Sequence, residues 1–211
     1  MPATLKKPNF LVDSRWLGKH RRDASLVLVD TRAAEDYRQG HLRGARHFDP
    51  FPFHHQDTSE RGMAEFRAQL RWIFSALGIS GRETVVCYEN DSGMRATRVA
   101  WALEYVGHPR AKILDGGLKS AATEKLVKDA PKFAPASFRA KPGDHAAAGY
   151  YYIVERIGGA DTQILDVRTD GEYFAERVRA RRGGAIPGAI HYEWVKANTE
   201  SGEFKSTDEL R

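Results

Sequence analysis

One stretch of the chain has the residue order of a site for an anion or a thiolate. Residues 84–88, Thr-Val-Val-Cys-Tyr, form a short β-branched apolar run, which predicts a buried strand. A polar loop follows at residues 89–95, and a helical pattern continues beyond it. A loop wrapped into the first turn of a helix points several N–H groups at one spot, where the helix dipole adds partial positive charge. Such a cradle favours anions and thiolates.

The side chains of this loop include two acids and no nucleophile. We expect the Asp91 carboxylate or the Ser92 hydroxyl to cap the helix, a contribution of roughly 1 kcal/mol. The cradle is then filled by the protein's own side chains. Cys87, the only cysteine, falls inside the predicted strand and is interpreted as a buried structural thiol. The loop consists of Glu89, Asn90, Asp91, Ser92, Gly93, Met94 and Arg95.

The elements that must position this loop alternate between strand and helix patterns. This alternation predicts an α/β fold, a parallel sheet of βαβ units with helices on both faces. A loop is expected at 49–62. Strands are predicted at 26–30, 46–48, 84–88 and 111–114, and helices at 14–19, 33–39, 64–77, after residue 93 and from residue 118. Asp13 is expected to cap the first of these helices.

Composition limits the class of protein and of partner. A chain of 211 residues with 41% apolar content allows one large domain or two small ones. It has no run of about 18 apolar residues and no signal-peptide core at its N-terminus, so we predict a cytoplasmic protein without a membrane partner. The single cysteine agrees with a reducing compartment. The net charge of +5 is scattered among acids, which favours small anions over nucleic acid.

The chain contains an internal repeat. Residues 163–168 match residues 27–32, and residues 188–191 match residues 44–47 after about eight inserted residues. Each copy has an aspartate and an arginine at the end of a strand, and we expect these side chains to brace the cleft or the domain interface. The pairs are Asp30 with Arg32 and Asp166 with Arg168.

A repeat of this length predicts two copies of one domain. The first copy spans residues 1–125, and residues 126–148, rich in Lys, Ala and Pro, are predicted to form an extended linker. The second copy, residues 149–211, contains only the start of the pattern. We therefore expect it to be incomplete, with the apolar residues of its first strand exposed unless more chain or a second polypeptide completes the sheet.

Several motifs in this order resemble the two-domain rhodaneses, the thiosulfate and 3-mercaptopyruvate sulfurtransferases, over nearly the whole chain. The resemblance implies tandem rhodanese-like domains, the first non-catalytic and the second catalytic. Two positions depart from the family pattern, Arg43 in place of proline and Ala185 in place of histidine. The motifs are Tyr37 with His41-Leu42-Arg43-Gly44-Ala45, the loop 88–98, Leu114-Asp115-Gly116-Gly117, and 184–189.

The family resemblance also implies the chemistry. A cysteine at the head of the second cradle attacks the outer sulfur of thiosulfate, and its persulfide passes sulfur to cyanide or a thiol. That cysteine would lie beyond Arg211, so we expect the 211-residue chain alone to be inactive, and the loop 89–95 to be vestigial. No cofactor is implied. The spacing of the histidines at 41, 47, 54 and 55 does not place three metal ligands on one element.

A basic cluster, Arg177, Arg179, Arg181 and Arg182, precedes the second Gly-Ala motif, where the resemblance places substrate-side arginines. We expect Arg179 and Arg182 to bind the sulfur-containing anion, although a solvated basic loop is an equal alternative. The mercaptopyruvate enzymes carry an arginine where this chain has Glu172, which favours thiosulfate as the donor.

Three other functions stay open at the level of sequence. The chain could belong to a non-catalytic binding or regulatory module, if the acid-filled cradle is the only one in the protein. A 3-mercaptopyruvate sulfurtransferase is the second alternative. A phosphatase-like relative is the third, but it needs a longer Cys-to-Arg loop, which these residues do not supply.

Overall fold

A parallel sheet organises the first half of the chain in a computed structural model, which describes residues 9–141 and 146–210. Five strands of the described residues form this sheet, and every neighbouring pair in it is parallel. The predicted α/β fold with a parallel sheet is therefore confirmed. In spatial order the strands are β1 (Leu11–Val12), β6 (Ala111–Leu114), β5 (Thr84–Tyr88), β2 (Leu26–Asp30) and β4 (Arg46–His47).

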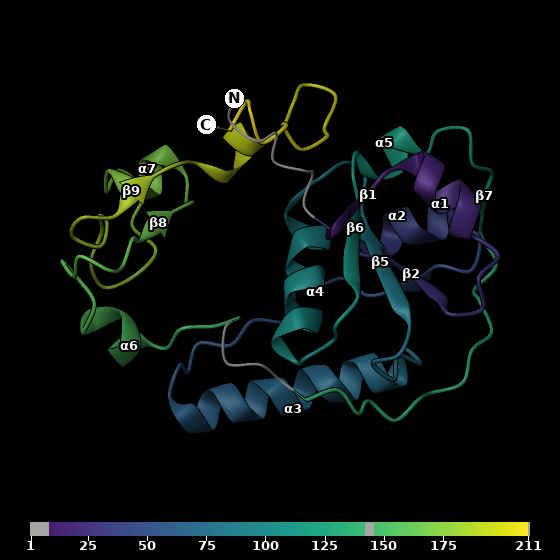
Figure 1. Ribbon diagram of the computed structural model, residues 1–211, viewed down its shortest axis with the longest axis horizontal. Helices are drawn as coiled ribbons and strands as arrows, with labels where there is room; N and C mark the ends of the chain where they lie inside the picture. The colour runs from purple at the N-terminus through teal and green to yellow at the C-terminus, as the bar shows by residue number, and fades with distance from the viewer. Residues whose placement is uncertain (1–8, 142–145, 211) are drawn as a thin grey trace.

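Helices cover both faces of this sheet (Figure 1). One face packs against α3 (Glu60–Ala76) and α4 (Met94–Tyr105), and the other against α1 (Ser14–His20) and α5 (Gly117–Ser120). The short helix α2 (Ala34–Gln39) follows β2. Side chains of β5 alternate between the two cores, so the strand is apolar throughout, as strands buried on both faces are.

One predicted helix boundary was wrong and another was confirmed. The helix expected from Ala64 begins four residues earlier, at Glu60, because Ser59 caps it by accepting a hydrogen bond from Gly62 N–H over 3.1 Å. The loop expected at 49–62 is correspondingly shorter. The helix expected from Leu118 is confirmed as a single turn, Gly117–Ser120, and it begins after Gly116, whose φ of +74° lies in the left-handed region.

Residues 126–141 of the predicted linker pack along the first half rather than spanning free solvent, and its residues 142–145 lie outside the described residues. Its strand β7 (Leu126–Val127) pairs antiparallel with β3 (His41–Leu42). Further on, Phe138 is buried in the core beside α3, and Arg71 donates hydrogen bonds to the carbonyls of Phe138 and Ala140 over 3.0 and 2.6 Å. The prolines favour this extended path, and long-range contacts hold it.

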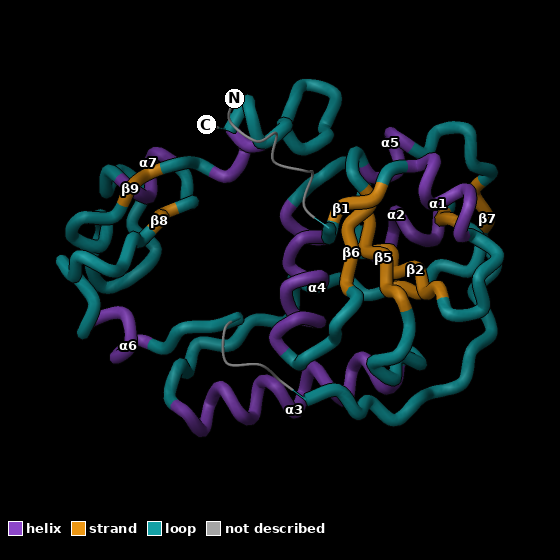
Figure 2. Tube along the Cα trace, viewed as in Figure 1, coloured by secondary structure: helices purple, strands orange, loops and turns teal. Residues whose placement is uncertain are grey.

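The second half forms a smaller unit, joined to the first by residues 146–149 and by the C-terminal segment (Figure 2). Its two strands pair in parallel, Leu165 beside Ile190 and Asp166 beside His191. Only two of the residues 163–168, which match residues 27–32 in sequence, are in a strand. The elements are α6 (Tyr150–Val154), β8 (Leu165–Asp166), α7 (Asp170–Tyr173), β9 (Ile190–His191) and the 3₁₀ helix η1 (Trp194–Ala197).

Candidate functional site

Glu89 fills the cradle at the start of α4. Its Oε1 accepts a hydrogen bond from Ala96 N–H over 2.8 Å, and the N-cap residue, Gly93, has no side chain to offer. A Cβ built on Gly93 would lie 2.7 Å from Glu89 Cδ, so the carboxyl group lies against the loop backbone. The prediction that the protein's own side chains occupy the cradle is confirmed. The prediction that Asp91 or Ser92 provides the cap was wrong.

The electrostatics of Glu89 combine two opposing effects. Burial raises the pKa of its carboxyl group, because the charged form loses hydration. Hydrogen bonds from the backbone N–H groups of Ala96 and Arg95 oppose that rise, and the nearby Asp91 adds to it. The cradle thus holds a carboxyl group in the place where an anion would bind, and its backbone donors are partly used.

The other side chains of the loop diverge from the cradle. Asp91 points toward solvent and pairs with Lys119 over 3.0 Å. Ser92 turns inward and donates to Asp115 Oδ1 over 2.9 Å. Arg95 pairs with Asp49 and lies over the ring of Phe51, its Cζ 4.4 Å from the ring centroid. Asn90 is exposed and contributes its carbonyl to Lys119 N–H, and Met94 is 44% exposed.

Cys87 is fully buried in β5, as expected from its place in an apolar run. Burial raises the pKa of its thiol far above the ordinary value. A thiol that resists ionisation is a poor nucleophile, because the thiolate is the reactive form. The first half therefore presents a helix-terminal cradle without a cysteine that could use it.

The aspartate and arginine at each strand end make the same contacts in both halves. Arg32 Nη2 donates to Asp30 Oδ2 over 2.7 Å and to the Gly40 carbonyl over 2.6 Å. Arg168 Nη2 donates to Asp166 Oδ2 over 2.6 Å and to the Gly184 carbonyl over 2.8 Å. Both pairs form, but the expectation that they brace the cleft or the domain interface was wrong. Each brace ties a strand end to a loop of its own half, and not to the other half.

The tyrosine that follows each aspartate–arginine pair also makes the same contact in both halves. Tyr37 OH donates to the Ala45 carbonyl over 2.8 Å, and Tyr173 OH donates to the Ala189 carbonyl over 3.1 Å. The register of β8 beside β9 matches that of β2 beside β4, with Asp30 paired to His47 and Asp166 to His191. The sequence repeat is thus a repeat of three-dimensional contacts.

The two halves differ in what covers the first strand. β2 has β4 on one side and β5 on the other, whereas β8 is paired in the described residues with β9 alone. Val29 is fully buried, whereas Leu165 and Val167 are 55% and 46% exposed. The apolar surface expected for the second half is therefore present on β8 and just after it.

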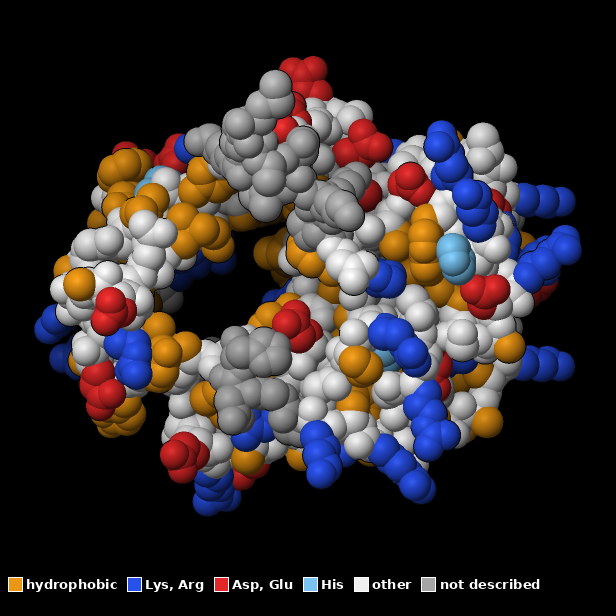
Figure 3. Space-filling model, viewed as in Figure 1, with side chains coloured by type: hydrophobic (Ala, Val, Ile, Leu, Met, Phe, Trp, Pro, Cys, Tyr) orange, Lys and Arg blue, Asp and Glu red, His pale blue; other side chains and the backbone are white. Residues whose placement is uncertain are grey.

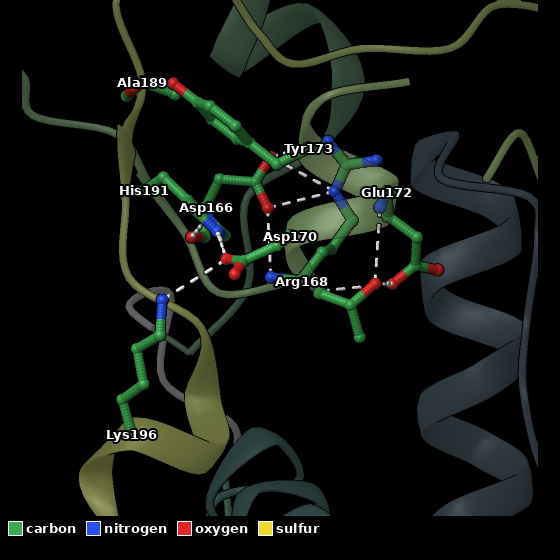
Figure 4. Close-up of polar contacts among 9 residues, drawn as sticks. Asp166, Arg168, Asp170, Glu172, Tyr173, Ala189, His191 and Lys196 are labelled. Atoms are coloured by element: carbon green, nitrogen blue, oxygen red, sulfur yellow. Dashed lines mark hydrogen bonds and ion pairs between the residues drawn. The ribbon is translucent and has the colours of Figure 1, made fainter. Parts of the chain in front are cut away.

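Glu172 of α7, whose polar contacts are drawn in Figure 4, pairs with Arg179, one of the two predicted anion-binding arginines. Glu172 accepts from Thr169 in a capping box, and Arg179 Nε lies 2.6 Å from Glu172 Oε1. Hydrogen bonds from Thr169 lower the pKa of Glu172, and the positive charge of Arg179 lowers it further. Arg179 therefore neutralises an acid of its own half, and Arg182 lies exposed in the loop beyond it.

Sequence reasoning missed a second cluster beside this one. Asp170 Oδ1 lies 2.7 Å from His191 Nε2 and 3.3 Å from Lys196 Nζ, and these hydrogen bonds lower the pKa of Asp170. The His191 ring also stacks on Tyr173 with the centroids 4.2 Å apart. The sequence repeat could have predicted part of this cluster. His191 corresponds to His47 of the first half, and His47 contacts Tyr37 there as His191 contacts Tyr173 here.

A cavity of about 900 Å³ lies between α4 and the second half. Met94 and Trp101 of α4 line one side, and Val167, Ile190 and Trp194 line the other. Hydrophobic side chains border this hollow in the space-filling view (Figure 3). Neither Arg179 nor Arg182 is among the described residues that line it. Ser92, Gly93 and Met94 of the loop 89–95 therefore line the cavity, whereas the two predicted arginines do not.

No helix within the described residues has the length and apolar character needed to cross a bilayer. Likewise, these residues contain no group of three or more His, Cys, Asp or Glu side chains arranged to hold a metal ion.

Comparison with known proteins places the chain among sulfur-transfer relatives. It is 35% identical to a thiosulfate sulfurtransferase of Azotobacter vinelandii, covering 82% of this chain and 64% of that protein. It is 33% identical to a thiosulfate sulfurtransferase of Pseudomonas aeruginosa, covering 81% and 64%. The chain thus spans less than two thirds of the length of these relatives.

A solved structure and a family model agree with this comparison. SseA from Escherichia coli, described as a 3-mercaptopyruvate sulfotransferase with a rhodanese fold, matches with a TM-score of 0.78 and 27% identity. That match covers 95% of this chain and 80% of SseA. The model of the rhodanese-like domain matches residues 13–124. These residues hold the whole parallel sheet apart from β1, together with its helices, and the chain belongs to the rhodanese-like family.

Proposed function

We propose that this chain is part of a sulfurtransferase that moves sulfane sulfur from thiosulfate to a thiophilic acceptor, cyanide or a thiol. One observation carries the proposal. The second half repeats the brace and strand register of the first, but β8 has no described neighbour corresponding to β5, the strand that leads into the cradle. The names of the relatives from Azotobacter and Pseudomonas support the reaction class.

The proposed architecture is a tandem of rhodanese-like domains. Residues 1–125 form the first, residues 126–148 the linker, and residues 149–211 the start of a catalytic domain. The exposed apolar side chains at Leu165 and Val167 support an incomplete second sheet, because a parallel strand is normally covered on both sides. Additional chain beyond Arg211 is the proposed completion, and a second polypeptide is the alternative.

The proposed chemistry needs a cysteine thiolate in the second cradle, C-terminal to Arg211. The thiolate attacks the outer sulfur of thiosulfate, the S–S bond breaks, and sulfite leaves with the bonding electrons. The cysteine persulfide then gives its terminal sulfur to cyanide, which forms thiocyanate and regenerates the thiolate. Backbone N–H groups and the helix N-terminus stabilise both anionic sulfur species. A reducing, cytoplasmic setting suits a mechanism that depends on a free thiolate.

The 211-residue chain should not form thiocyanate from thiosulfate and cyanide, because Cys87 is buried and its thiol resists ionisation. A longer polypeptide that continues beyond Arg211 in the gene should form it, and should lose this activity when the added cysteine is changed to serine. Thiocyanate formation is followed by colour development with ferric ion. Activity of the 211-residue chain, retained in a Cys87→Ser variant, would overturn the proposal.

The choice of donor is a finer proposal. The family resemblance implies that the mercaptopyruvate enzymes carry an arginine at the position of Glu172. In this chain that position is an acid and pairs with Arg179, so we propose thiosulfate over 3-mercaptopyruvate as the donor. Measuring kcat/KM for both donors with the longer polypeptide tests this choice. A preference for 3-mercaptopyruvate would favour a 3-mercaptopyruvate sulfurtransferase, the class in which the structurally similar SseA is described.

A non-catalytic module is the second candidate function, and the filled cradle favours it. Glu89 occupies the only cradle described in this chain, and no thiolate competes with it. The intact mass of the protein isolated from its natural source discriminates the two. A mass of 23.7 kDa supports the non-catalytic module or completion of the sheet by a second polypeptide, and a mass larger by several kDa supports the sulfurtransferase with additional chain.

A further inference from the structure

A tight turn near the end of the chain docks against the first half. Gly202 N–H donates to the Thr199 carbonyl over 3.0 Å, and Asn198 and Phe204 form an antiparallel bridge. The turn, residues 198–204, meets the first half at the carboxyl ends of β5 and β6. It is therefore a point at which the second half is fixed to the loop that follows β5.

Two buried polar residues receive this turn. Ser92 Oγ–H donates to Asp115 Oδ1 over 2.9 Å, and Ser92 Oγ accepts from Gly116 N–H over 2.7 Å. Phe204 N–H of the turn donates to the same Asp115 Oδ1 over 2.8 Å. Ser92 and Asp115 are only 1% and 2% exposed. Buried polar groups of this kind are stabilised only while their partners stay in place.

Backbone contacts extend the same joint. Ser92 N–H donates to the Gly202 carbonyl over 2.7 Å, and the Asn198 side-chain amide donates to the Ser92 carbonyl. Gly202 has a φ of +88°, and a Cβ built on it would lie 2.6 Å from Asp91 Cβ. Only glycine allows the turn to approach the Asp91 side chain this closely in this backbone conformation. The turn and the loop therefore fit each other closely.

We propose that Ser92 and Asp115 form a latch that positions the second half. Asn198 and Phe204 of the turn, together with Ser92 and Gly93, line the 900 Å³ cavity, so the latch fixes one wall of it. The inference rests on the proposed function in one respect, that this cavity is part of the cleft where sulfur transfer takes place. The loop that carries no nucleophile thus gains a role as a docking surface.

Hydrogen exchange of the 211-residue chain tests the latch without any measurement of activity. Asn198→Ala and Gly202→Ala change only the turn, outside the parallel sheet. Ser92→Ala changes a residue of the first half that contacts the turn. Each should make the amides of Ser92 and Phe204 exchange at least about tenfold faster, because each opens the joint locally. The amide of Val86 in β5 should keep its protection. Lys119→Ala, which removes the exposed ion pair with Asp91, is the matched control and should change none of them.

Each outcome decides the proposal. Faster exchange confined to the latch supports it. Unchanged protection at Ser92 and Phe204 in the two turn variants would overturn it, as would equal acceleration at Val86, which indicates general destabilisation. The exchange result is independent of catalysis, so an inactive longer polypeptide would reject the proposed function and leave the latch standing. In an active longer polypeptide, Gly202→Ala should lower kcat/KM while the protection of β5 is kept.

Discussion

At the scale of single residues, Glu89 stabilises the start of α4 by accepting from Ala96 N–H. Glu89→Ala should lower the free energy of unfolding by about 1–2 kcal/mol, since it leaves that donor without an acceptor. Glu89→Gln keeps an acceptor oxygen and removes the buried charge. Because the pKa of Glu89 is raised in the folded protein, the wild type loses stability as pH rises through that pKa. The glutamine variant should therefore equal or exceed the wild type at pH 7.

Urea denaturation at pH 4 and pH 7 measures both effects of Glu89. Asp91→Ala on the same loop is the control, because its pair with Lys119 is exposed and should contribute about 0.5 kcal/mol or less. A Glu89→Ala variant as stable as this control would show that the carboxyl group does not cap the helix.

His108 should make the protein sensitive to acid. It is 3% exposed, its Nδ1 accepts from Arg110 N–H over 3.2 Å, and its Nε2 has no hydrogen-bond partner among the described residues. Burial lowers the pKa of His108 to about 4, below the ordinary 6.5. Between pH 4 and pH 6.5 the folded state therefore binds fewer protons than the unfolded state. The free energy of unfolding should fall by roughly 3 kcal/mol as the pH drops from 6.5 toward 4.

Chemical denaturation at several pH values between 4 and 7 measures the contribution of His108. In His108→Asn, the Oδ1 atom can replace Nδ1 as an acceptor, and the slope over that window should become shallower. A slope that does not change on this substitution would place the acid sensitivity elsewhere.

At the scale of elements, the sequence predicted the strands and helices that depend on local composition. The apolar runs of β2 and β5 predict strands buried on both faces, and Asp13 predicts the cap of α1, which it provides by accepting from Trp16 N–H over 2.6 Å. The two-residue strands β1, β3 and β7 were missed. Each is defined by a partner far along the chain, as Leu11 is by Ile113, and two residues carry no periodicity.

The two braces give a matched pair for measurement, because their contacts agree and their burial differs. The side chains of Arg32 and Asp30 are 9% and 0% exposed, whereas those of Arg168 and Asp166 are 44% and 8% exposed, so the second pair is open to solvent on its arginine side. Arg32→Ala should cost about 3 kcal/mol or more, since it leaves a buried carboxylate without its partner. Arg168→Ala should cost about 1 kcal/mol or less. Hydrogen exchange in β2 and β9 reports the two local stabilities separately.

At the scale of the whole molecule, the sequence predicted the repeat but not how the halves meet. The offset between the copies is visible in the residues, and the contacts at Asp30 and Asp166 match it. The joint between Asp115 and Phe204 spans 89 positions and uses a backbone N–H, which any residue except proline supplies. The filling of the cradle by Glu89 rather than Asp91 was missed for a similar reason, since both are acids and only geometry separates them.

Completion of the second sheet should raise the energetic cost of breaking the pair between Asp166 and Arg168. If a strand beyond Arg211 covers the free side of β8, then Leu165, Val167 and the Arg168 brace become buried as Val29 and its neighbours are. The cost of Arg168→Ala, measured by hydrogen exchange at β9, should then rise in the longer polypeptide from about 1 kcal/mol toward the larger cost of a buried pair. The cost of Arg32→Ala should be the same in both lengths of chain. An unchanged cost of Arg168→Ala would mean that the added segment does not pair with β8, and the proposed tandem architecture would fail even if the longer polypeptide were active.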